Sequence, residues 1–153
     1  MSFPASNSLV LRQVLDRAQI ATVSGLLGVT VAAYLDVADD PAGPSEPDVF
    51  ASLTSTHRAA MQAEQSFVWC LERFGGAREV METASVAHHC ARWLDQAYAD
   101  LEAARRRPPR WRQLLHLADA PDAEVRAERA RAYAHAAMAY SEQVERLRDL
   151  LAA

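Results

Sequence analysis

The chain has 153 residues, of which 50% are hydrophobic, so it is long enough to bury the core of one domain without disulfide or metal support. Its formal net charge of −4 lacks the basic excess of general nucleic-acid binders and of proteins attracted to anionic membranes. We therefore expect a single domain over residues 1–153, with no nucleic-acid partner and no membrane partner. The N-terminal stretch shows no positively charged segment before an apolar one, so we also expect a cytoplasmic protein.

Clusters of proline, glycine and aspartate divide the chain into long segments with helical periodicity. The clusters are DDPAGPSEPD at 39–48, FGGA at 74–77, RRRPPRWR at 105–112 and ADAPDAE at 118–124. Between them, apolar residues recur at the three- and four-residue spacing of helices. The pattern predicts helices at about 8–37, 47–74, 77–106 and 121–151, with a short extra helical turn at 111–118. Because the connections are short, we expect an all-α, antiparallel up-down-up-down four-helix bundle.

The first predicted helix contains an uncharged segment, Ala18 to Leu35, with about the length of a short membrane span. Its polar Gln, Thr and Ser residues and the absence of a polar flank with a positive-inside bias favour instead a buried central helix of a soluble bundle. Gly25 and Gly28 belong to a stripe of small residues on this helix. Such a stripe indicates either close helix packing or room for a ligand, so both glycines are candidate ligand-binding residues.

The second predicted helix carries two polar residues at core positions. Its heptad-spaced core positions are Phe50, Leu53, His57, Ala60, Glu64, Phe67, Leu71 and Phe74. His57 and Glu64 therefore fall where the pattern requires buried residues, and buried polar groups are informative exceptions.

The third predicted helix contains the run His88, His89 and Cys90, which resembles a cluster of metal ligands. Successive residues of a helix point about 100° apart, so these three side chains cannot converge on one ion. We expect His89 on a solvated face and His88 on one flank of the core, on the same side as Asp95.

The tight turn at Gly75 and Gly76 predicts which residues of the second and third helices face each other. In this antiparallel hairpin, residues at equal height have numbers that sum to about 151 or 152, which sets Glu64 level with His88 and His57 level with Asp95. Each carboxylate can then hold an imidazole in one tautomer or charge state.

Two interpretations of these pairs stay open. Polar layers inside bundles often serve only to fix helix register. Alternatively, His57, Glu64, His88 and Asp95 are catalytic candidates for acid–base chemistry on a small molecule. A metal site is not expected, because the two levels lie about 10 Å apart and neither Glu-x-x-His nor His-x-x-x-His occurs in the chain.

An arginine-rich segment follows the third helix. Arg107, Arg110 and Trp111 lie in RRRPPRWR, a composition that can bind phosphate groups, so they too are candidate ligand-binding residues. In an up-down-up-down bundle this segment lies at the same end as the acidic segment that contains Glu46 and Asp48. Salt links from its arginines, which include Arg105, to the acidic segment are the alternative use.

The fourth predicted helix has a second apolar line beside its alanine seam. The members of this line are Tyr133, Tyr140, Val144, Leu147 and Leu151. A helix that is apolar on more than one side needs a covering surface, so we expect a homodimer formed through this helix or the first.

The chain contains no phosphate-binding loop, dinucleotide fingerprint, metal-ligand spacing or nucleophile elbow. We therefore predict a binding or interaction module, with a small-molecule enzyme that uses the Glu64–His88 and His57–Asp95 pairs as the alternative. The sequence identifies no cofactor.

Overall fold

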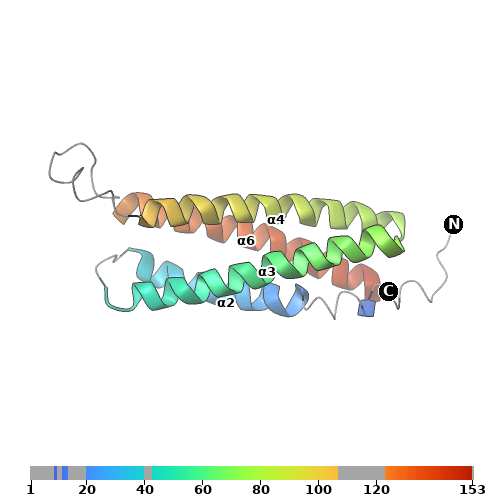
Figure 1. Ribbon diagram of the computed structural model, residues 1–153, viewed down its shortest axis with the longest axis horizontal. Coiled ribbons are helices and arrows are strands. Elements are labelled where there is room, and N and C mark those ends of the chain that lie inside the picture. The colour runs from blue at the N-terminus through green and yellow to red at the C-terminus, as the bar shows by residue number, and fades with distance from the viewer. Residues whose placement is uncertain (1–8, 10–11, 14–19, 40–42, 107–122, 153) are drawn as a thin grey trace.

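The computed structural model of the chain is built from four long helices (Figure 1). They are α2 (Ile20–Ala38), α3 (Glu46–Phe74), α4 (Arg78–Arg105) and α6 (Ala123–Ala152). The structure describes residues 9, 12–13, 20–39, 43–106 and 123–152, and no strand occurs among them. The predicted four-helix, all-α fold is confirmed. The expected extra turn at 111–118 and most of the expected segment 8–19 lie outside the described residues.

Each helix packs antiparallel against the next one along the chain, and α6 returns against α2 to close the bundle (Figure 1). The α4 and α6 backbones approach closely, and the buried positions of both helices are rich in small side chains such as Ala87 and Ala136. The α3 and α4 ribbons instead diverge from their connecting turn toward the other end of the bundle. The rings of Phe50 and Tyr98 fill the space between them there.

The α3–α4 turn depends on one glycine. Gly75 ends α3 with φ of 68°, and its backbone N–H donates to the carbonyl oxygen of Leu71 over 2.7 Å. Residues with a side chain rarely adopt a positive φ, so glycine suits this turn. The turn holds α3 and α4 in the register on which the polar pairs depend.

The apolar line on α6 lies inside the bundle. Its members Tyr133, Tyr140, Val144, Leu147 and Leu151 are all buried. The expectation that this line marks an exposed surface was wrong, because α6 packs against both α2 and α4 and so buries a wide arc of its circumference. The line therefore gives no support to dimerisation through α6.

The α2 helix lies at the periphery of the bundle. It packs against α3 and α6 on one side, whereas Leu26 and Val29 on its other side are 54% and 67% exposed. By length and composition alone α2 is apolar enough to cross a membrane, with a mean hydropathy of 1.7, yet only 33% of its most apolar window is buried. The expectation of a buried central helix was therefore wrong.

Candidate functional site

The α3–α4 register brings both predicted pairs together. The His57 Nε2 atom lies 2.9 Å from Asp95 Oδ1, and His88 Nδ1 lies 3.5 Å from Glu64 Oε1. The predicted pairing of an imidazole with a carboxylate at two levels is thus confirmed. The roles of the four residues remain predictions, and the two levels differ in detail.

The level around His57, called here the His57 layer, is fully hydrogen-bonded. The ring is 2% exposed, and its Nδ1 atom lies 2.8 Å from the hydroxyl of Tyr133. The ring also stacks on Tyr98, with 4.3 Å between centroids and 10° between planes. Both nitrogens have partners, and an aromatic ring covers one face of the imidazole.

The charge state of His57 follows from this burial. Burial lowers its pKa, and the hydrogen bond to Asp95 offsets only part of that effect, so the imidazole is neutral at neutral pH. Burial raises the pKa of Tyr133, which keeps its hydroxyl protonated. Tyr133 therefore donates to Nδ1, and Nε2–H donates to Asp95. Each donor in this layer meets an acceptor.

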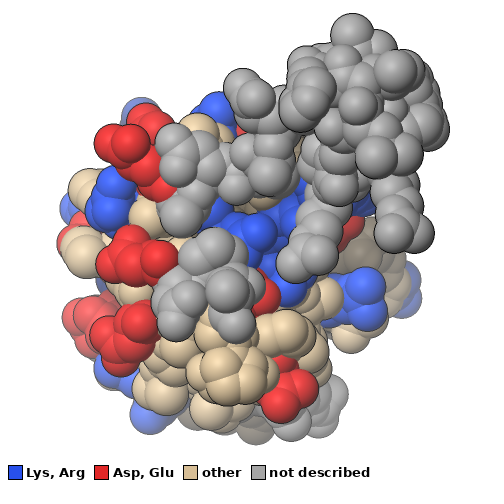
Figure 2. Space-filling model, turned by 90° about the vertical axis from the view of Figure 1, so that its left-hand side faces the viewer, with Lys and Arg blue, Asp and Glu red and all other residues tan. Residues whose placement is uncertain are grey.

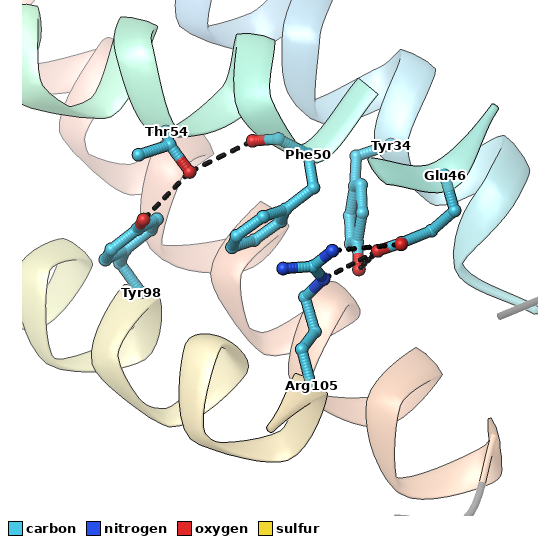
Figure 3. Close-up of polar contacts among 6 residues, drawn as sticks. All are labelled: Tyr34, Glu46, Phe50, Thr54, Tyr98 and Arg105. Atoms are coloured by element: carbon cyan, nitrogen blue, oxygen red, sulfur yellow. Dashed lines mark hydrogen bonds and ion pairs between the residues drawn. The ribbon is translucent and has the colours of Figure 1, made fainter. Parts of the chain in front are cut away.

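The tyrosine that covers His57 is itself fixed by α3. Figure 3 shows the Tyr98 hydroxyl donating to Thr54 Oγ1 over 2.8 Å and the Thr54 hydroxyl donating to the Phe50 carbonyl over 3.0 Å. The chain of bonds holds the Tyr98 ring between α3 and α4. It leaves little freedom for a ligand to enter the His57 layer.

The level around Glu64, called here the Glu64 layer, is only partly hydrogen-bonded. The Tyr140 hydroxyl donates to Glu64 Oε2 over 3.0 Å. Glu64 Oε1 and His88 Nδ1 are both buried, and neither has a hydrogen-bond partner among the residues that the structure describes. The His88 side chain is 45% exposed, whereas that of Glu64 is 5% exposed. This layer is therefore open on its α4 side.

The pKa of Glu64 is higher in the folded protein than in water, so its protonated form is favoured. Burial raises the pKa of Glu64, and the hydrogen bond from Tyr140 and the proximity of His88 offset this only in part. A buried carboxyl beside a half-exposed imidazole is an arrangement that can exchange a proton with a ligand.

A groove between α3 and α4 leads to this carboxyl. One part, about 300 Å³, is lined by Met61, Glu64, Gln65, Val68, His88, Ala91, Arg92 and Asp95. A second part, about 180 Å³, shares Val68 and His88 and continues toward the turn past Leu71, Met81 and Ala84. The combined groove has an acidic portion at the Glu64 layer and an apolar portion near the turn.

The groove shows no obvious metal site. In the described ranges, no group of three or more His, Cys, Asp and Glu side chains lies close enough to hold a metal ion. His89 is exposed while His88 faces the groove, so the neighbouring histidines diverge as expected.

Cys70 and Cys90 are free thiols, and burial raises the pKa of Cys90.

A third polar cluster closes the end of the bundle opposite the Gly75 turn. Arg105 donates to both oxygens of Glu46, over 2.6 and 3.0 Å, and the Tyr34 hydroxyl donates to the same carboxylate over 3.0 Å (Figure 3). Burial raises the pKa of Glu46, but the bonds from Arg105 and Tyr34 outweigh it and lower the pKa overall. This bonding confirms the predicted salt link between the arginine-rich and acidic segments.

Figure 2 shows this end of the molecule, where basic side chains gather between acidic ones. Arg105 and Arg126 are among the basic residues that act on Glu46. The candidate ligand-binding residues Arg107, Arg110 and Trp111 lie outside the described residues.

The candidate glycines do not face the polar pairs. Gly25 and Gly28 are exposed and line a surface depression between α2 and α6, together with Ser141, Glu145 and Arg148 of α6. Both glycines of the stripe therefore lie away from His57 and Glu64. In the same depression, Ser24 donates to Ser141 over 2.8 Å. Ligand binding at the two glycines remains a prediction.

Sequence reasoning missed the tyrosines that complete the layers. Tyr133 and Tyr140 are seven residues apart on α6, the same spacing that separates His57 from Glu64 on α3. This shared heptad spacing could have predicted that each tyrosine meets one of these polar residues, since buried tyrosine hydroxyls need hydrogen-bond partners.

Comparison of the chain with protein-family models, with curated proteins and with solved structures gives no match. Arguments about function therefore depend on the geometry of the groove and of the two layers.

Proposed function

We propose that this protein is a small-molecule-binding module whose ligand occupies the groove between α3 and α4, over Glu64 and His88. The observation that carries the proposal is the buried Oε1 atom of Glu64, a residue that lines the groove. Within the described residues this atom accepts no hydrogen bond, and His88 Nδ1 lies 3.5 Å from it. A buried polar atom without a hydrogen bond is costly, and a bound ligand that donates to it would remove that cost.

The shape of the groove supports the same function. Ligand sites are concave and mostly apolar, with a few polar groups that orient the ligand. The groove offers apolar walls from Met61, Val68 and Ala91 around the Glu64 and His88 side chains. In the His57 layer only Asp95 lines the groove, while the His57 ring is buried and hydrogen-bonded on both nitrogens, so this layer serves as structural support.

A fragment screen by ligand-observed NMR tests this function. Val68→Trp places a large side chain in the groove, and Val86→Trp is the matched control because Val86 is 47% exposed and does not line the groove. We expect fragments that bind the wild-type protein and Val86→Trp but not Val68→Trp. Fragments that bind all three proteins equally would contradict the proposed site.

The second candidate function is an enzyme that uses Glu64 and His88 as an acid–base pair. The raised pKa of Glu64 beside a half-exposed imidazole favours it. For any groove ligand that is converted to product, Glu64→Gln should abolish turnover while the ligand still binds. Turnover that survives in Glu64→Gln would reject this role.

We propose, in addition, that the protein dimerises through the outer side of α2. Leu26 and Val29 are exposed beside two glycines that permit close helix contact, and Glu145 and Arg148 of the adjoining α6 can pair across a two-fold axis. Burying this face would keep an apolar surface from water. Light scattering should report a dimer that Val29→Glu converts to a monomer, and a monomeric wild-type protein would refute the proposal.

A further inference from the structure

We propose that the groove selects an organic cation, namely a primary ammonium group attached to an unbranched apolar tail. This inference rests on the proposed binding function and names the class of ligand. It follows from the hydrogen-bonding groups at the Glu64 layer, the charges around them and the apolar part of the groove.

The two atoms without partners at the Glu64 layer can both act as acceptors. Glu64 Oε1 is a carboxyl oxygen, and His88 Nδ1 is an acceptor in the tautomer that carries its hydrogen on Nε2. They lie 3.5 Å apart, so one ammonium nitrogen on the groove side of the pair, at about 2.9 Å from each, can donate to both. An ammonium has three N–H donors and no acceptor, which suits a pair of neighbouring acceptors.

The charged groups around this point favour a cation. Glu64 and Asp95 line the groove from α3 and α4, and Glu142 of α6 is close enough to raise the pKa of Cys90. Against these carboxylates, the groove lining contributes the guanidinium of Arg92, which lies on an exposed position of α4. Tyr140 of α6 stays protonated because burial raises its pKa, so it adds no negative charge.

The rest of the groove suits an apolar tail. From the Glu64 layer the groove runs toward the turn past Val68 and Leu71 of α3 and Met81 and Ala84 of α4. Seven helical residues separate Glu64 from Leu71, so this portion is about 10 Å long at 1.5 Å per residue. A ligand that places its ammonium at Glu64 can therefore bury an unbranched chain over two helical turns.

Binding of an ammonium should be linked to the protonation of Glu64. A nearby cation favours the carboxylate, so the ligand should displace a proton from Glu64. Since His88, Cys90, Asp95 and Arg92 also face this region, the linkage must be assigned with Glu64→Gln. The affinity should strengthen as pH rises from 4.5 through the raised pKa of Glu64, and this rise should be absent in the variant.

Three probes with six carbon atoms each test the inference by calorimetry: hexylammonium, hexan-1-ol and hexanoate. We expect hexylammonium to bind most tightly and to lose roughly tenfold or more in affinity in Glu64→Gln. Binding should disappear in Val68→Trp and persist in Val86→Trp. Thermal melting of each variant confirms that it is folded.

The outcomes separate this inference from the proposed function. If hexanol or hexanoate binds in the groove more tightly than hexylammonium, the cation preference is wrong and the binding function stands. If hexylammonium binds equally well to Glu64→Gln, the assignment of its ammonium to Glu64 is wrong. If none of the three probes binds, the ligand class is overturned, and the fragment screen decides whether the groove binds a ligand at all.

Discussion

Two polar layers cross the bundle one heptad apart, and each combines a side chain from α3, one from α4 and a tyrosine from α6. The His57 layer joins Asp95 and Tyr133, and both imidazole nitrogens are hydrogen-bonded. The Glu64 layer joins Tyr140 and His88, and one carboxyl oxygen remains without a hydrogen bond in the described part of the chain. Equivalent positions in one heptad pattern thus produce a closed layer and an open one.

The difference arises largely from one position on α4. Tyr98 covers His57, whereas the position seven residues earlier is Ala91, which lines the groove at the Glu64 layer. A methyl group leaves the volume that an aromatic ring fills in the other layer. A heptad pattern therefore specifies which residues meet, while the sizes of their neighbours decide whether the contact is sealed.

The largest effect should come from removing the centre of the closed layer. His57→Ala deletes a buried ring and leaves the Tyr133 hydroxyl without its acceptor. We expect a loss of about 3 kcal/mol in the free energy of unfolding by urea denaturation. His89→Ala, at an exposed position next to His88, should change stability by less than about 0.5 kcal/mol. Equal losses in the two variants would show that the His57 layer is not structural.

The next effect should come from opening the closed layer. Tyr98→Ala removes the ring that stacks on His57, together with the hydroxyl that donates to Thr54. We expect a loss of about 2 to 3 kcal/mol in the free energy of unfolding, since the cavity left behind cannot collapse fully. Hydrogen exchange should also accelerate around His57. Unchanged exchange there would mean that Tyr98 does not seal the layer.

The reverse change should close the open layer. Ala91→Tyr introduces a ring at the position equivalent to Tyr98, and we expect it to abolish binding of groove ligands. Because Ala91 is buried, the added ring must displace its neighbours, and we expect a loss of about 1 to 3 kcal/mol in the free energy of unfolding in the same urea experiment. Full ligand affinity in a folded Ala91→Tyr protein would place the ligand elsewhere.

The polar pairs could be predicted because the Gly75–Gly76 turn sets the α3–α4 register and because His57 and Glu64 interrupt an apolar pattern. The side of α2 that faces inward could not be predicted. Residues 20–35 carry no charge on either side, so the pattern has no polar face to identify solvent. The inward position of Tyr133 and Tyr140 was missed for a related reason. The sequence of α6 has two apolar lines, and the pattern does not show which of them faces the core.

The smallest effect is a pair of opposite pH dependences. The pKa of His57 is lowered in the folded protein, so its contribution to stability is complete above 6.5 and falls as pH drops below that value. The pKa of Glu64 is raised, so its contribution is complete below 4.5 and falls as pH rises from 4.5 through the folded-state pKa. Urea titrations across this range should lose the second dependence in Glu64→Gln and retain the first.

The most direct test introduces the same residue into both layers and compares the free energies of unfolding of His57→Gln and Glu64→Gln at pH 7. Glutamine can still accept the hydrogen bond from Tyr140, but it cannot reproduce both bonds and the stacking of the imidazole. We predict a loss above about 2 kcal/mol for His57→Gln and below about 1 kcal/mol for Glu64→Gln. An equal or larger loss for Glu64→Gln would make the Glu64 layer structural and contradict its assignment as a ligand site.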